Sequence, residues 1–132
     1  MARWVGGVFL VCLGMTGCAV PVPVVFTVAS PMSAPDVHRC VTERLVEHGF
    51  RVVESRREDG ILKAERQAIL RGGRPITGAL DVIDVAVYER RDGRTGVQYT
   101  AAYAILSETP KLREPTDRVR AIAERLAEGC SD

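Results

Sequence analysis

Cysteine is the residue type in this chain with the widest chemistry. The 132 residues include four cysteines, Cys12, Cys18, Cys40 and Cys130. A thiol can carry a lipid, pair in a disulfide, bind a metal or take part in redox exchange. Metal sites and redox couples favour a short Cys-x-x-Cys spacing, which these cysteines do not have. Lipid attachment and disulfide formation are therefore the favoured chemistries.

Cys18 directly follows a short apolar run near the N-terminus. Arg3 places a positive charge before this run, Trp4–Leu13 supply its apolar residues, and Thr16 and Gly17 are small residues beside the cysteine. This order is typical of an export signal, and the run is shorter than the roughly 20 apolar residues that span a bilayer. Residues Met15-Thr16-Gly17-Cys18 resemble the lipobox of bacterial lipoproteins, whose cysteine receives a diacylglycerol.

The lipobox resemblance implies a lipid-anchored protein. Residues 1–17 would be removed as a signal peptide, and Cys18 would become the lipidated first residue. Ala19 follows the cysteine, where an Asp commonly retains a Gram-negative lipoprotein in the inner membrane. The resemblance thus favours the outer membrane, with the domain facing the periplasm. The alternative is an ordinary secretory signal that is cleaved nearby and leaves Cys18 as a thiol.

Cys40 and Cys130 are the two cysteines that remain once Cys12 is removed and Cys18 is lipidated. The envelope is oxidising, so we expect a disulfide between them. Such a bridge would close most of the domain and contribute about 4–5 kcal/mol in the chain-entropy model. A metal pair and a redox couple are the alternatives.

Charge and proline content set the organisation of the chain. There are 18 Lys and Arg against 17 Asp and Glu, without the basic stripe that nucleic-acid binding requires. Residues 18–35 are rich in proline and predict an extended tether, followed by a single domain over residues 36–132. Within the tether, Val24–Val28 has strong β preference and is either an edge strand or a plain linker.

Two amphipathic helices are predicted at the ends of this domain. The first begins with Ser33 or Asp36 as its N-cap and ends at Gly49. The second begins with Thr116 as its N-cap and ends at Gly129. Their apolar stripes are Val37, Cys40, Val41 and Leu45 in the first helix, and Val119, Ile122, Ala123 and Leu126 in the second.

Four strands are predicted between the helices, in two hairpins. They span residues 50–56, 61–70, 79–89 and 96–106. The first hairpin is expected to pair Val52 with Ala68, and the second to pair Tyr88 with Tyr99. The predicted fold is α+β, a four-stranded antiparallel sheet with two helices on one face and the element order (β)-α-β-β-β-β-α.

The expected register of the second hairpin gathers three tyrosines on one face. With Tyr88 opposite Tyr99, the helices cover the face of Ile83, and the other face carries Tyr88, Tyr99 and Tyr103. Tyrosine is enriched at interfaces because it joins a large apolar ring to a polar group. We interpret these three residues as a partner-binding surface, with ordinary strand tyrosines as the alternative.

Histidines and paired carboxylates offer little further chemistry. His38 and His48 are ten residues apart around the first helix and nearly opposite by helical rotation. Asp81 and Asp84 are three residues apart in a strand, so they point to opposite faces. We therefore expect no metal site, no cofactor and no catalytic residue.

The predicted order of elements resembles that of the lipopolysaccharide-assembly lipoprotein and other small envelope lipoproteins that attach to larger assemblies. The resemblance is one of architecture, and no functional residue is carried over from it. It implies a membrane-anchored, non-enzymatic accessory protein that binds another envelope protein or a lipid. The alternative is an envelope hydrolase or redox factor with an unfamiliar site.

Overall fold

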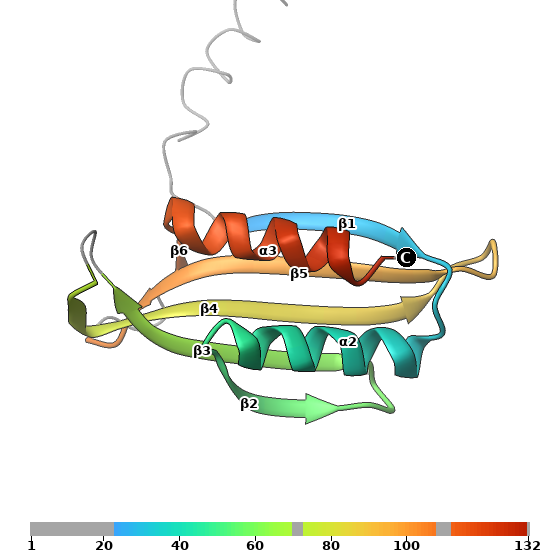
Figure 1. The fold of residues 1–132 in the computed structure, drawn as a ribbon, viewed down its shortest axis with the longest axis horizontal. Coiled ribbons are helices and arrows are strands. Elements are labelled where there is room, and N and C mark those ends of the chain that lie inside the picture. The colour runs from blue at the N-terminus through green and yellow to red at the C-terminus, as the bar shows by residue number, and fades with distance from the viewer. Residues whose placement is uncertain (1–22, 70–72, 108–111, 132) are drawn as a thin grey trace, which may run out of the picture.

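The computed structural model describes residues 23–69, 73–107 and 112–131, and this part of the chain forms one antiparallel sheet and two helices. The elements are β1 (Val24–Ser30), α2 (Ala34–Glu47), β2 (Arg51–Arg56), β3 (Ile61–Ile69), β4 (Pro75–Glu89), β5 (Thr95–Ile105), β6 (Leu112–Arg113) and α3 (Asp117–Gly129). The strands lie in the order β1-β5-β4-β3-β2, and β6 also pairs with β5. Both helices cover the same face of the sheet (Figure 1). The predicted α+β class is confirmed, but the sheet has six strands instead of four.

The two additional strands both lie along β5. β1 pairs antiparallel with β5 from Val24 opposite Ala101 to Ser30 opposite Thr95. Residues 24–30 therefore form an edge strand of the sheet, which is the first of the two alternatives that the sequence left for this segment. β6 adds two residues farther along the same edge of β5. A strand this short has no alternating pattern that a sequence could reveal.

The N-cap of α2 is Ser33, one of its two predicted caps, and the N-cap of α3 is the predicted Thr116. The Ser33 hydroxyl accepts a hydrogen bond from the Asp36 amide at 3.3 Å, and the Thr116 hydroxyl accepts one from the Val119 amide at 3.4 Å. Each cap satisfies one of the four amides that a helix start leaves without a partner. None of the helices in the described part of the chain is long and apolar enough to cross a membrane.

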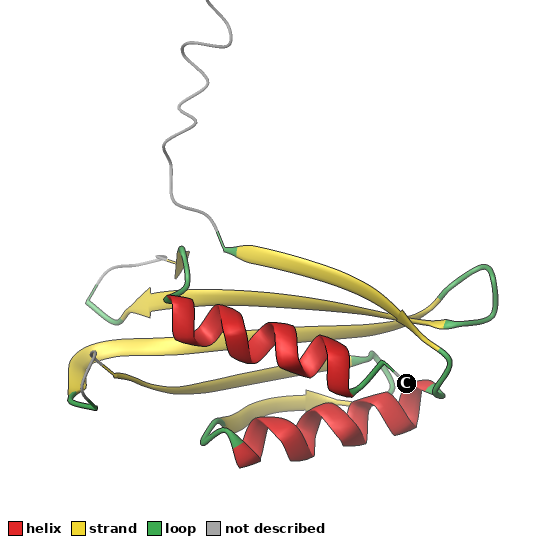
Figure 2. Cartoon of the chain, turned by 45° about the horizontal axis from the view of Figure 1, so that its top comes forward, coloured by secondary structure: helices red, strands yellow, loops and turns green. Residues whose placement is uncertain are grey.

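A single core lies between the helices and the sheet. Its largest fully buried apolar side chains are Tyr99, Leu45, Leu62, Ile83, Leu126, Val37, Val41, Val97 and Val119. The helices lie side by side on this core (Figure 2). A disulfide joins Cys40 of α2 to Cys130 at the end of α3, with 5.8 Å between the two Cα atoms. The predicted pairing of these cysteines is thus present.

The register of the β4–β5 hairpin differs from the prediction. Tyr88 lies opposite Gly96, and Tyr99 lies opposite Val85. Residues 90–94 form the loop, which is closed by a 2.9 Å hydrogen bond from the Arg90 amide to the Arg94 carbonyl. The partners are displaced by three residues from the expected ones. Because side chains alternate between faces, this odd displacement moves every β5 side chain to the other face of the sheet.

The β2–β3 hairpin also pairs differently. Val52 lies opposite Ala64 instead of Ala68, and the register shifts between Val52 and Glu54. At the turn, Gly60 has a φ of +69°, and a Cβ there would collide with the Val87 carbonyl. The displacement from the expected partner is four residues, an even number, so it does not exchange the two faces of the strands.

Candidate functional site

The three tyrosines predicted to share a surface lie in different environments. Tyr99 is 0% exposed on the helix side, where its hydroxyl donates a 3.3 Å hydrogen bond to the Leu126 carbonyl of α3. Burial raises the pKa of the Tyr99 hydroxyl well above its ordinary value. Tyr103 is half-buried on the same side, opposite Asp81. Tyr88 alone is on the helix-free side, where it is 42% exposed. The predicted three-tyrosine surface is therefore wrong, and a binding role stays a prediction for Tyr88 only.

Phenylalanine substitutions should separate the roles of these tyrosines. Tyr99→Phe removes the buried hydrogen bond from the Tyr99 hydroxyl to the Leu126 carbonyl, which keeps only its bond from the Cys130 amide. We therefore expect the free energy of unfolding to fall by about 0.5–1.5 kcal/mol. Tyr88→Phe removes an exposed hydroxyl and should change the free energy of unfolding by less than about 0.5 kcal/mol. Urea titration of both variants measures the difference. Equal effects would contradict the register that buries Tyr99.

The helix-free side of the sheet, which we call the open face, is left uncovered by the helices (Figure 2). Cross-strand pairs place its residues in rows across the strands. The row nearest the β4–β5 loop carries Tyr88 beside Gly96, where the ring covers the glycine. The row at the far end contains Leu112, Ala104 and Leu80.

Charged groups occupy the middle of the open face. Asp84 of β4 lies between Lys63 of β3 and Thr100 of β5. Burial raises the pKa of the Asp84 carboxyl, while the Lys63 charge lowers it. Lys63 also lies 4.0 Å from Glu54, which forms a 2.7 Å ion pair with Arg56. These four charged side chains comprise two acids and two bases, so their charges balance. The middle of the open face is therefore polar without a strong net charge of either sign.

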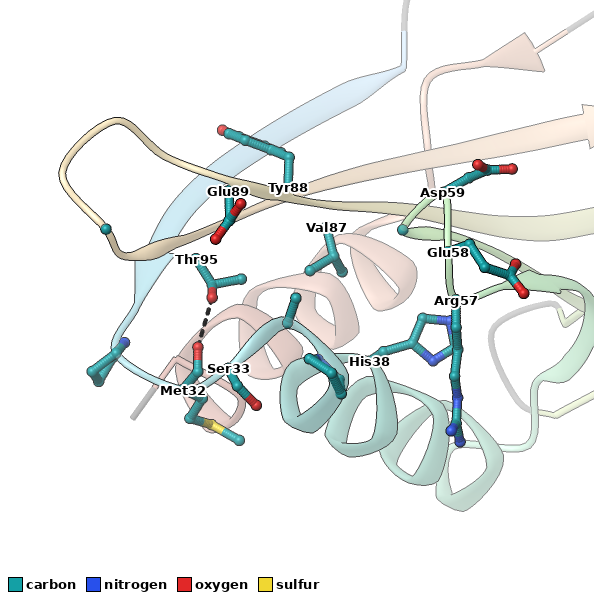
Figure 3. A pocket seen from close by; sticks show the side chains of 15 residues that line it. Met32, Ser33, His38, Arg57, Glu58, Asp59, Val87, Tyr88, Glu89 and Thr95 are labelled. Atoms are coloured by element: carbon teal, nitrogen blue, oxygen red, sulfur yellow. Dashed lines mark hydrogen bonds between the residues drawn. The ribbon is translucent and has the colours of Figure 1, made fainter.

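A cleft of about 740 Å³ opens at the β4–β5 loop end of the domain. The β1–α2 connection, the start of α2, the β2–β3 turn and the ends of β4 and β5 line it (Figure 3). A hydrogen bond of 2.6 Å from the Thr95 hydroxyl to the Met32 carbonyl fixes one wall. Glu58 and Asp59 extend from the turn on the opposite side (Figure 3).

His38 is the histidine that lines this cleft. It is buried in the first turns of α2, and its Nε2 lies 3.4 Å from the Ser55 hydroxyl. A serine nucleophile requires a base that a third group orients. Within residues 23–69, 73–107 and 112–131, no carboxylate hydrogen bonds to this ring, and no group of three or more His, Cys, Asp or Glu is placed to hold a metal. The pair is thus better described as a polar contact between α2 and β2.

Comparison with known proteins gives no family for this chain. No protein-family model matches the sequence, and no curated protein matches it significantly. The function must therefore be argued from the residues and their geometry.

A buried ion pair lies on the helix side of the sheet, far from the cleft. Arg66 Nε of β3 donates to Asp81 Oδ2 of β4 at 3.1 Å, and the side chains are 12% and 3% exposed. Arg66 also donates a 2.8 Å hydrogen bond to the His48 carbonyl at the end of α2, and its guanidinium lies 4.7 Å from the centre of the Phe50 ring. Arg66 Nη2 and Asp81 Oδ1 are buried without a partner.

This pair joins three elements and was not predicted from the sequence. The structure confirms that Asp81 and Asp84 point to opposite faces, since Asp81 is buried under the helices and Asp84 lies on the open face. A signal for the pair was available, because Arg66 and Asp81 each occupy an inward position of a strand. A charge at such a position needs a partner when it is buried.

Proposed function

We propose that this protein is a lipid-anchored, non-enzymatic accessory protein of the bacterial cell envelope, held on the outer membrane with its domain in the periplasm. The Met15-Thr16-Gly17-Cys18 sequence carries the proposal, because it resembles the site at which lipoproteins are cleaved and lipidated. The disulfide between Cys40 and Cys130 supports an oxidising compartment. Cys12 lies in the predicted signal peptide, so Cys18 is the one thiol that the mature chain would have left for the lipid.

The position of β1 supports a domain that is held close to the membrane. Val24 is the first residue of β1 and follows Cys18 by six residues. A fully extended chain of that length spans at most about 20 Å. The open face would therefore be available close to the membrane, where it could bind another envelope component. Its β-rich, mixed-charge surface offers binding area instead of a reaction centre.

Replacing Cys18 by alanine tests the anchor. We expect Cys18→Ala to remove acyl labelling and to release the protein from the membrane fraction, because no other residue would carry the lipid chains. A single acyl chain gives only marginal membrane binding, and two or more give stable anchoring. The measurement is fractionation of envelopes after metabolic labelling with a fatty acid, together with the mass of the mature protein.

Cys12→Ala is the matched control for this experiment. It also removes a cysteine from the N-terminal run but leaves the lipobox intact, so labelling and sedimentation should stay at the wild-type level. If Cys18→Ala still carries label and sediments with membranes, the anchor is elsewhere and the proposed function is wrong.

A further inference from the structure

One end of the open face is apolar and exposed. Leu112 of β6 lies opposite Ala104 of β5, which lies opposite Leu80 of β4, so the three form one row across the sheet. Leu106 follows directly after β5, and its amide donates a 2.8 Å hydrogen bond to the Gly78 carbonyl. Leu106 is 61% exposed and Leu112 is 49% exposed. We call Leu80, Ala104, Leu106 and Leu112 the end patch.

The end patch lies at the end of the sheet where β1 begins. Figure 1 shows the start of β1, the end of β5, β6 and the start of α3 at this same end. Val25, the second residue of β1, is 53% exposed and also lies on the open face. The reach from Cys18 to Val24 is at most about 20 Å, so a lipid on Cys18 would hold this end of the domain nearest the membrane.

The charges around the end patch are mixed. Lys111 and Arg113 flank Leu112 in the sequence, and residues 106–120 together carry four basic and three acidic side chains. Glu114 forms a 3.1 Å ion pair with Arg120. This segment therefore provides no strong positive field for anionic headgroups. Any attraction of this end to a lipid surface must come mainly from its leucines, whose burial in the interface is favourable without charge.

We propose that the end patch inserts into the lipid surface beside the Cys18 anchor and fixes the orientation of the domain. This inference rests on the proposed function, because it requires the lipid on Cys18. The β4–β5 pairing extends over eleven residue pairs, from Ala79–Ile105 to Glu89–Thr95. At about 3.4 Å per residue, the β4–β5 loop then lies roughly 35 Å from the patch. The strands stand away from the membrane, and the middle of the open face stays accessible to water.

Single tryptophans can report this orientation. The only tryptophan of the chain is Trp4, in the predicted signal peptide, so the mature protein would contain none. Lipidated Leu112→Trp and Leu106→Trp would be placed in phosphatidylcholine vesicles with and without bromine at the shallow acyl positions. A side chain seated about 5–10 Å into the interface should lose about half or more of its emission to the bromine and should shift to shorter wavelength.

Two control positions lie at the β4–β5 loop end of the domain. Tyr88 is 42% exposed on the open face, and Arg91 is exposed in the loop itself. We expect Tyr88→Trp and Arg91→Trp to show neither quenching nor a shift. Circular dichroism of each variant checks that the domain is folded, and Val25→Trp replaces either leucine variant that is not.

Each outcome decides a separate point. Quenching of Tyr88→Trp as strong as that of Leu112→Trp would mean that the face lies flat, and no quenching at any position would mean that the domain is not in contact with lipid. A shift of Leu112→Trp that depends on protein concentration in the absence of vesicles would assign the patch to a second copy. Each of these overturns the orientation proposed, whereas a mature protein without the lipid mass on Cys18 overturns the proposed function itself.

Discussion

Replacing Asp81 by valine should lower the free energy of unfolding by about 3–5 kcal/mol, because it leaves Arg66 buried without its counter-charge. Arg66 is held in place by its hydrogen bond to the His48 carbonyl and by the Phe50 ring, so it cannot turn to solvent without losing both contacts. Arg66→Met should lower the free energy of unfolding by a similar amount, because Asp81 then stays buried without its counter-charge.

The double variant Arg66→Met/Asp81→Val should be much less destabilised than either single variant. An apolar pair of similar volume often replaces a buried ion pair at little cost, or with a gain. A double-mutant cycle by urea titration measures the coupling. Arg39→Met is the control, because Arg39 pairs with Asp36 on the surface and should contribute at most about 1 kcal/mol. Additive single effects would show that Arg66 and Asp81 do not interact.

The pH dependence of stability gives a second measure of this pair. Burial raises the pKa of the Asp81 carboxyl above 3.8, although the charges of Arg66 and Arg118 lower it. The folded state then binds a proton at a higher pH than the unfolded state does. Wild-type protein should therefore gain stability relative to Asp81→Asn as the pH falls from neutrality through that raised pKa. Asp84 is present in both proteins, so its contribution cancels. A relative loss on acidification would contradict the raised pKa.

Removing the disulfide should lower the free energy of unfolding by about 2–5 kcal/mol. Cys40 and Cys130 are separated by 90 residues, so the bridge restricts most of the unfolded domain. In the folded state it also joins α2 to the end of α3. The comparison is between wild-type protein and Cys40→Ala/Cys130→Ala, both in a Cys18→Ala background, by urea titration without reductant.

Reduction provides the control for that comparison. Addition of dithiothreitol should bring the wild-type midpoint close to that of the double alanine variant, and it should leave the variant unchanged. If the two proteins unfold at the same urea concentration without reductant, the bridge does not constrain the unfolded chain. In that case the packing of the helices on the sheet would suffice to hold them.

The order of the main elements was predictable because their patterns are local. The caps Ser33 and Thr116 and the helical spacing of Val37, Val41 and Leu45 specified the two helices without reference to the rest of the chain. The pairing of Cys40 with Cys130 followed from the compartment and from the cysteine count. The proposed anchor at Cys18 also depends only on adjacent residues.

The tertiary structure decided the register of the strands. The register in turn decided which residues lie on each face of the sheet. A register that shifts by two residues leaves each side chain of a strand on the same face of the sheet. A register that shifts by an odd number of residues moves every side chain to the other face. The five-residue loop after Glu89 placed Tyr99 under α3 and left Tyr88 outside. Whether residues 24–30 formed a strand depended on a free edge of β5, which no local pattern could reveal. The Arg66–Asp81 pair likewise required the register of β3 against β4, because a buried charge is stable only where its partner is brought within reach.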